Sequence, residues 1–353
     1  MGCSTGNASS EKPSFNIAAF SRGKAPVFNA AKSKKQTKGR VANNKGIDWS
    51  RDGKHLAFTW RNSKSSWGIS VTDLSHTITV AKDLASEPYI SSGVGYQLFW
   101  WDKLGNLSYL EDATTGKVTA VKKLPITISS GQVSPNGSPL VMVASSDRGS
   151  SIIYLETPSL VSVVTLAFDL PVRMIRWSPK GDQLAILRYP SKEAIFNSKL
   201  EEYLYVDDLR LNSITPLVTN RQVLRHSWGW NKDGRYIYFA ERTLERVKAL
   251  RVWKVDCVTK KQKLIVDFAS AGIYIEAMIP SPDGDALLVV QRKSKDAYEL
   301  GLIDLAKKKW WTVASGDLWM PSWSPSGDRF AISINGNLWV IQRDTLKGRC
   351  VFP

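Results

Sequence analysis

Seven turns that end in glycine recur along the chain, and their even spacing constrains the fold more than any other feature. Neighbouring glycines are 42, 42, 44, 53, 50 and 43 residues apart; they are Gly53, Gly95, Gly137, Gly181, Gly234, Gly284 and Gly327. The residues three and five positions after each glycine are apolar in all fourteen cases. A period of about 40 to 50 residues is typical of a repeat protein, in which each repeat buries the faces of its neighbours.

Each repeat has the pattern of short strands joined by tight turns. Four repeats carry a tryptophan four residues before the glycine, and two copies read WSPKGDQLAI (177–186) and WSPSGDRFAI (323–332). Proline and glycine favour a tight turn, and the consecutive apolar residues after it predict a strand buried on both faces. A third strand then ends in an acid, at Asp73, Asp112, Asp208, Asp256 and Asp304. We expect each of these acids to cap its turn rather than to act in catalysis.

Seven four-stranded units that cover one another predict an all-β fold, a seven-bladed β-propeller of antiparallel blades. The second unit, SSGVGYQLFW (91–100), lacks the Ser-Pro turn, so a six-bladed ring is the alternative. A first inner strand near 46–49 and a last strand at 348–352 predict blades that are continuous in sequence, with the ring closed by side-chain packing. Alternatively, residues 25–30 (APVFNA) add an edge strand.

The repeated pattern W-S-P-x-G-x-x-L-A resembles the TolB-type, WD-like propeller repeats of bacterial envelope proteins and of prolyl-oligopeptidase-type peptidases. The resemblance covers residues from about 46 to 352 and implies a fold but no activity. Two departures limit it. TolB resembles a six-bladed propeller behind a separate α/β domain, and the peptidases carry an α/β-hydrolase domain for which this chain has neither the room nor a strand-to-helix nucleophile elbow.

The net charge of +16 is unevenly distributed. Residues 1–46 contain nine Lys or Arg and one acid, Glu11, so this segment carries +8 and the remaining 307 residues carry the other +8. Its polar composition cannot bury enough apolar surface to offset the entropy of ordering. The sequence therefore predicts a flexible basic leader at 1–45 and a propeller at 46–353, with no apolar run of the roughly 18 to 20 residues that a membrane helix needs.

The N-terminal sequence MGCSTGNASS suggests a lipid anchor at Cys3. Gly2-Cys3 before a Ser-rich stretch looks like the junction of a bacterial lipoprotein, which is the favoured interpretation. A eukaryotic myristoylation start is a second interpretation, although Gly6 stands where that motif has Ser or Thr. An unmodified cysteine is the third. The three cysteines form no disulfide or zinc pattern.

No catalytic, metal-binding or cofactor-binding motif stands out. The three histidines, His55, His76 and His226, are not spaced as part of a catalytic triad, and we expect structural roles for them. The segment SPDGD (281–285) is acidic enough to suggest calcium, but it lies in the repeated turn, and we expect it to be a turn only. We therefore predict no catalytic residues, no metal and no cofactor.

The longest loops between second and third strands fall in units four, five and six, and such loops usually carry partner contacts. Their charges nearly balance, which argues against nucleic acid and favours a protein partner. The predicted contact residues are Tyr189, Lys192, Phe196, Lys199, Arg242, Arg246, Lys248, Arg292, Lys293 and Tyr298, with the three aromatic residues as anchors.

Together these features favour a non-catalytic, lipid-anchored propeller of the bacterial cell envelope that acts as a protein-interaction scaffold. A propeller hydrolase or lyase with its site in the central channel is one alternative. A scaffold subunit of a larger membrane complex is another, and a cytoplasmic location is the alternative to the envelope.

Overall fold

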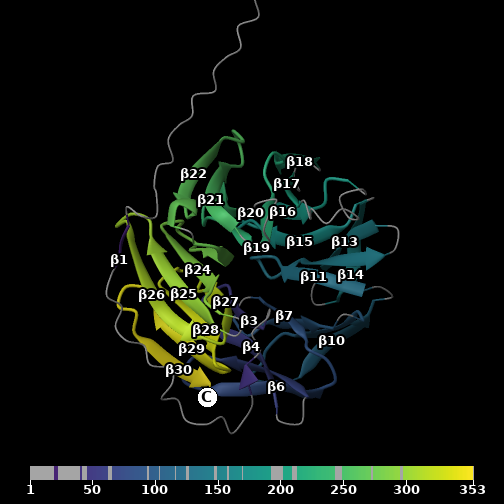
Figure 1. Ribbon diagram of the computed structural model, residues 1–353. Helices are drawn as coiled ribbons and strands as arrows, with labels where there is room; N and C mark the ends of the chain where they lie inside the picture. The colour runs from purple at the N-terminus through teal and green to yellow at the C-terminus, as the bar shows by residue number, and fades with distance from the viewer. Residues whose placement is uncertain are drawn as a thin grey trace, which may run out of the picture.

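The structure is a computed structural model. It describes residues 20–22, 40–41, 46–62, 66–93, 95–102, 104–115, 117–124, 127–146, 149–156, 159–168, 170–191, 202–208, 213–242, 249–271, 273–294 and 297–352. These residues form an all-β ring of seven four-stranded antiparallel blades, which confirms the predicted fold class (Figure 1). Within the described part of the chain, the one helical segment is a single 3-10 turn, η3 (Ala269–Ala271), and no helix is long and apolar enough to cross a bilayer.

The first four blades follow one another in sequence. Blade 1 contains β3 (Ile47–Trp49), β4 (Leu56–Arg61), β5 (Trp67–Thr72) and β6 (Thr77–Leu84). Blade 2 contains β7 (Tyr89–Ser92), β8 (Leu98–Trp101), β9 (Asn106–Leu110) and β10 (Val118–Lys123). Blade 3 contains β11 (Thr127–Val133), β12 (Leu140–Ser146), β13 (Gly149–Glu156) and β14 (Val161–Phe168). Blade 4 contains β15 (Val172–Trp177), β16 (Gln183–Arg188), β17 (Tyr203–Asp208) and β18 (Ser213–Val218).

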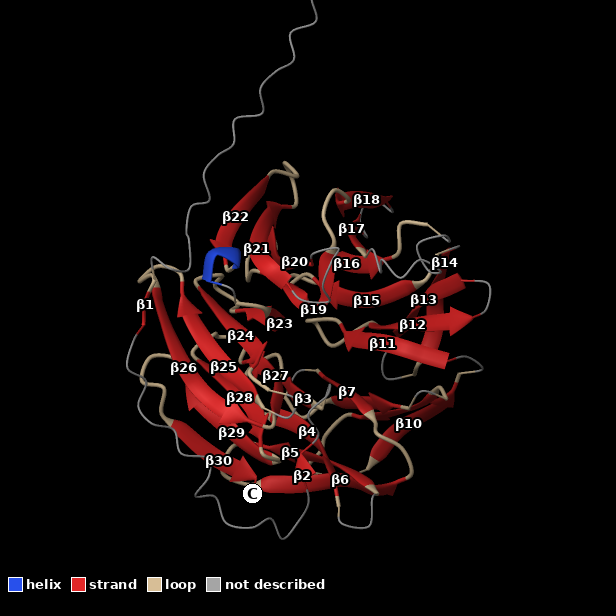
Figure 2. Cartoon of the chain, viewed as in Figure 1, coloured by secondary structure: helices blue, strands red, loops and turns tan. Residues whose placement is uncertain are grey.

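The last three blades complete the ring. Blade 5 contains β19 (Val223–Trp230), β20 (Tyr236–Arg242), β21 (Ala249–Asp256) and β22 (Gln262–Asp267). Blade 6 contains β23 (Ile275–Pro280), β24 (Ala286–Arg292), β25 (Tyr298–Asp304) and β26 (Lys309–Gly316). Blade 7 contains β27 (Leu318–Trp323), β28 (Arg329–Ile334), β29 (Asn337–Gln342) and β30 (Gly348–Phe352). Figure 2 shows these strands radiating from a central axis.

The ring closes between blades 7 and 1 without exchange of a strand, as predicted. All four strands of blade 7 are consecutive in sequence, and its inner strand β27 contacts the inner strand β3 of blade 1. One apolar cluster joins the two blades, with Trp49 and Phe58 on one side and Leu338 and Phe352 on the other. The Phe58 and Phe352 rings lie 4.9 Å apart. Side-chain packing therefore carries the closure.

Two short strands come from the segment expected to be a flexible leader. β1 (Ser21–Arg22) pairs in parallel with the outer strand β26, and β2 (Arg40–Val41) extends the inner edge of blade 1 by pairing with β4. Residues 21–22 and 40–41 thus pair with propeller strands, although they come before the boundary that the sequence predicts at residue 46. The alternative edge strand at 25–30 and most of the leader lie outside the described residues.

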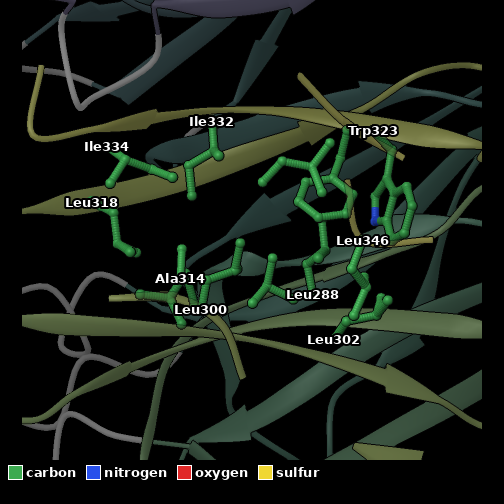
Figure 3. Close-up of a cluster of buried hydrophobic side chains, with 14 of the residues drawn as sticks. Leu288, Leu300, Leu302, Ala314, Leu318, Trp323, Ile332, Ile334 and Leu346 are labelled. Carbon is green, nitrogen blue, oxygen red and sulfur yellow. The ribbon is translucent and has the colours of Figure 1, made fainter. Parts of the chain in front are cut away.

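The core consists of the faces between blades. Figure 3 shows one such layer, in which Leu288, Leu300 and Leu302 of blade 6 face Leu318, Ile332 and Ile334 of blade 7. All of these side chains are at most 2 % exposed. Burying a leucine or isoleucine contributes about 1.5 to 3 kcal/mol, so each blade depends on its neighbours for stability.

The repeated tryptophan joins blades 1, 4, 5 and 7 each to the blade before it. The indole N–H groups of Trp49, Trp177, Trp230 and Trp323 donate to carbonyls on the inner strand of the preceding blade, at distances of 3.0 to 3.2 Å. In blade 2, Ser92 occupies the tryptophan position, and its hydroxyl donates to the Asp48 carbonyl at 3.2 Å. The turn of blade 2 is one residue shorter, because Ser92 pairs with Leu98 whereas Trp49 pairs with Leu56. This explains why the second repeat is hard to recognise in the sequence.

Candidate functional site

The central channel has two different ends. One end carries the seven repeated turns between first and second strands, and there the repeated residues serve the fold. Each turn glycine at Gly53, Gly181, Gly234 and Gly327 has positive φ and lies beside a turn proline of the preceding blade. In the same turns Ser178, Ser281 and Ser324 accept a backbone N–H five residues further on. This end is a ring of interlocking turns.

Four of the five acids at the ends of the third strands are turn residues, as expected. The fifth, Asp208, accepts from the Gln183 side chain at 3.1 Å, and residues 209–212 after it lie outside the described residues. Backbone N–H groups donate to the carboxylates of Asp73, Asp112, Asp256 and Asp304. These bonds lower the pKa of Asp73 and Asp256, and the Thr114 hydroxyl and N–H lower that of Asp112. In the acidic turn at 281–285, Asp283 accepts from the Ser281 hydroxyl and the Asp285 N–H and pairs with Arg343. These contacts place Asp283 in the repeated turn.

The opposite end, where the inner strands begin, is irregular. The inner strands of blades 3 to 7 each contain a register shift near their start, whereas those of blades 1 and 2 pair regularly. The extra residue is Ser129 in blade 3, Arg173 in blade 4 and Glu276 in blade 6. A β-bulge redirects a side chain out of the regular pleat and is common beside functional sites. We call this end the channel mouth, with Tyr89, Arg173, Glu202, Arg225 and Glu276 as its polar residues.

Two arginines and one buried glutamate form the centre of the channel mouth. Arg173 Nε lies 3.4 Å from Glu202 Oε1, and Glu202 is only 5 % exposed. The Arg225 Nη2 atom lies 3.5 Å from the Arg173 carbonyl oxygen, which is a weak hydrogen bond. The Arg225 Nε atom is buried and has no hydrogen-bond partner among the described residues. Arg225 therefore has a buried donor that Glu202 does not satisfy.

Burial is the main cause of the pKa shifts of the ionisable groups at the channel mouth. Burial raises the pKa of Glu202, although Arg225 and Arg173 oppose this shift. Burial, together with repulsion from Arg173, lowers the pKa of Arg225. Burial also raises the pKa of Tyr89, which Arg225 partly offsets. Because Tyr89 belongs to blade 2 and Arg225 to blade 5, these two side chains act on each other across the axis.

A third arginine, Arg176, lies further along β15, the inner strand that also carries Arg173. The Arg176 guanidinium lies over the Trp228 ring at 4.9 Å, between blades 4 and 5, and burial lowers its pKa to about 10. Blades 4 and 5 thus contribute three arginines to the axis from β15 and β19. Such guanidinium groups bind carboxylates and phosphates through paired hydrogen bonds.

Of the predicted partner residues, the structure describes Tyr189 at blade 4, Arg242 on blade 5, and Arg292, Lys293 and Tyr298 on blade 6. Tyr189 is 4 % exposed and lies beneath Arg173, whose guanidinium is 5.4 Å from its ring, so it supports the channel mouth rather than forming an exposed anchor. Arg292 lies 5.6 Å from the Tyr298 ring, and Lys293 pairs with Glu299 at 3.3 Å, on blade 6. Arg242 ends β20. Cys3, Lys192, Phe196, Lys199, Arg246 and Lys248 lie outside the described residues.

The histidines do not meet at the channel mouth as a triad. His55 lies against Tyr96 with the rings tilted by 38° and 3.7 Å between their centroids, and His76 follows Asp73 in a turn of blade 1. His226 lies beside Arg225 on β19. Among the described residues no group of three or more His, Cys, Asp or Glu is arranged to hold a metal ion.

Comparisons with known proteins show the fold. No family model matches the chain. A relative described as an uncharacterized protein of Agrobacterium fabrum is 23% identical over 212 residues, covering 56% of this chain and 67% of its own length. A structure of oligogalacturonate lyase in complex with manganese has a TM-score of 0.68 at 12% identity, covering 87% of this chain and 91% of that one.

Two further solved structures are similar. The β-propeller domain of Cps50 (Swd1) from Myceliophteria thermophila has a TM-score of 0.59 at 13% identity, covering 90% of this chain and 98% of that one. A chain of the mitotic checkpoint complex has a TM-score of 0.57 at 15% identity, covering 91% and 99%. These neighbours include an enzyme and a chain of a protein complex, and at such identities the likeness shows the fold alone. The chain is a seven-bladed β-propeller with WD-like blades.

Proposed function

We propose that this protein is a non-catalytic binding propeller, held at a bacterial envelope membrane through Cys3, which takes an acidic segment of a protein partner at the channel mouth. The observation that carries the proposal is that Arg173 and Arg225 share the one buried carboxylate of Glu202, which leaves the buried Arg225 Nε atom without a hydrogen-bond partner among the described residues. A carboxylate from a partner would give the Arg225 guanidinium the acceptor that Glu202 does not supply. Charge-assisted hydrogen bonds of this kind are about twice as strong as neutral ones.

The neighbouring surface supports a protein rather than a small anion as the ligand. Arg292, Lys293 and Tyr298 lie on the same face of the ring as the channel mouth, because second strands end and inner strands begin on that face. An aromatic ring and long cationic side chains around a buried polar centre are typical of a protein interface.

A binding measurement with a defined probe tests the channel mouth. We expect a fluorescent tetraglutamate peptide to bind the full chain, and a tetraglutamine peptide not to bind. Arg225→Gln should weaken binding at least about tenfold, because the loss of one charged hydrogen-bond pair costs about 1.5 to 3 kcal/mol. Arg349→Gln, on the exposed outer strand of blade 7, is the matched control and should bind normally. Equal binding by both variants contradicts the proposal.

The envelope location rests on the resemblance of the repeat to TolB-type repeats and on Gly2-Cys3. An acylated cysteine with two or more chains gives stable anchoring. The mass of the protein extracted from its native host with detergent tests this part separately. We expect a mass increase on the peptide that contains Cys3, and an unmodified Cys3 contradicts the anchor without affecting the channel mouth.

One observation favours an enzyme as a second candidate. The channel mouth holds two carboxylates, Glu202, which pairs with Arg173, and Glu276, at the bulge near the start of β23, and oligogalacturonate lyase is among the similar structures. On this alternative the arginines would bind the carboxylates of an acidic sugar, and the chain would cleave it by elimination or hydrolysis. Incubation with oligogalacturonate and manganese tests it. An unsaturated or shortened product that Arg225→Gln abolishes would favour the enzyme over the scaffold.

A third candidate is a scaffold subunit of a larger membrane complex, which the likeness to a chain of the mitotic checkpoint complex favours. Size-exclusion chromatography of a detergent extract from the native host distinguishes it from a binary interaction. Migration of the protein in a stable multi-subunit particle would favour the complex.

A further inference from the structure

A second concave site lies at the outer corner of blade 5, on the face opposite the channel mouth. It is a cavity of about 340 Å³ lined by Arg235, Tyr236, Lys254, Asp256, Thr259, Lys261, Gln262 and Lys263. Four of these residues are cationic and one is acidic. The acid does not serve the lysines, because Asp256 Oδ2 pairs with Arg235 at 3.0 Å and Oδ1 accepts the N–H groups of Val258 and Thr259.

The strand register forces two of these lysines together. Lys254 on β21 is the direct cross-strand partner of Lys263 on β22. Like charges at such positions destabilise a sheet. Lys261 begins the same edge, one residue before β22, and adds a third ammonium group to the cavity. The Tyr236 ring lies 4.6 Å from Lys254 Nζ and 5.5 Å from the Arg235 guanidinium, and it forms an aromatic floor under both.

We propose that this cavity, which we call the blade 5 corner, binds a phosphate group, carried either by a soluble phosphate compound or by a lipid headgroup. Three ammonium groups that converge on one concave surface are neutralised by a compact dianion, and lysine is a common phosphate ligand. The same corner in blade 7 provides a comparison. In blade 7 the Gln342 N–H donates to the Lys347 carbonyl, just as the Asp256 N–H donates to the Lys261 carbonyl in blade 5. The cross-strand pair differs, because blade 7 has Val340 opposite Arg349 where blade 5 has Lys254 opposite Lys263.

Thermal unfolding with inorganic phosphate tests the proposal. At constant ionic strength set with sodium chloride, phosphate should raise the unfolding midpoint of the full chain, and the rise should saturate with concentration. Lys263→Met should abolish this rise. It should also raise the midpoint without phosphate, because it removes the repulsion with Lys254. Lys347→Met, at the equivalent corner of blade 7, should keep the full response.

The outcomes separate the two sources of phosphate. Saturable binding of inorganic phosphate supports a soluble ligand. Binding only to vesicles that contain phosphatidic acid, lost in Lys263→Met and weakened by Val258→Asp at the exposed tip of the turn, supports a lipid headgroup; Val258 is 79% exposed. No response to either probe, or a response that Lys263→Met leaves intact, overturns the proposal. None of these results depends on the channel mouth.

Discussion

At the scale of single residues, the repeated tryptophan has a role that its hydrophobicity does not explain. A leucine would fill the space between blades, but it could not donate to the carbonyl of the preceding inner strand. The Trp177 indole N–H donates to the Gln132 carbonyl at 3.1 Å, and Trp177 is only 5% exposed. Each such bond fixes the register of one blade against the next.

Substitution of this indole should therefore lower the free energy of unfolding by more than the loss of packing alone. Trp177→Phe should lower the free energy of unfolding by about 1 kcal/mol more than Trp101→Phe, because one hydrogen bond is lost in addition to the packing. Trp101 is the matched control, since it is 2 % exposed and its Nε1 atom has no hydrogen-bond partner among the described residues. Urea unfolding of the two variants measures the difference. Equal losses would mean that the indole acts by packing alone.

Glu202 provides a pH prediction at the same scale. Its pKa is raised by burial, so the folded protein retains this proton to higher pH than the unfolded chain does. The resulting contribution to stability is complete below the ordinary glutamate pKa and is lost as pH rises through the raised pKa. Glu202→Gln, which stays neutral, should thus gain stability relative to the wild type as the pH rises above the ordinary glutamate pKa. Urea unfolding at a series of pH values measures it, and a difference that does not change with pH contradicts the assignment.

At the scale of strands, β2 acts as a clasp between the first and last blades. Val41 N–H donates to the Gly336 carbonyl at 2.8 Å, the Val41 carbonyl accepts from the Ser333 hydroxyl, and the Val41 side chain is 2 % exposed. Arg40 pairs with Asp317 of blade 7 beside it. These contacts supplement the packing that closes the ring.

Deletions on either side of β2 test its role. A chain that begins at residue 46 should be less stable than one that begins at residue 39 by about 2 to 4 kcal/mol, from one buried valine and two hydrogen bonds. The midpoint and slope of urea unfolding give this difference. If the two chains are equally stable, β2 does not contribute to closure.

The sequence predicts blades better than it predicts the channel mouth, for a physical reason. Turn glycines, prolines and paired apolar positions repeat because every blade has the same backbone to satisfy, so Leu184 and Phe330 are found by period alone. Arg173 and Arg225 differ from their equivalents in other blades, and their convergence depends on bulges and on the curvature of the ring. Their signal in the sequence is the presence of arginines within inner strands, in VRMIRW and VLRHSWGW.

At the scale of the whole molecule, the ring separates two surfaces of different chemistry. The channel mouth brings Arg173 and Arg225 together near the axis, and the blade 5 corner presents lysines at the rim of the other face. If the corner binds a phosphate-bearing surface, the channel mouth is directed away from that surface. The antiparallel order of the strands in each blade produces this separation. Inner strands begin on one face of the ring, and the turns between third and fourth strands lie on the opposite face.

Site-specific photo-crosslinking in the native host tests the proposed binding face most directly. A photoreactive residue at position 292 lies on the face of the channel mouth, and one at position 258 lies on the opposite face. We predict a discrete protein adduct from position 292 that disappears with Arg225→Gln and persists with Arg349→Gln. An adduct formed from position 258 alone, or one from position 292 that Arg225→Gln leaves unchanged, would contradict the assignment of the channel mouth as the partner site.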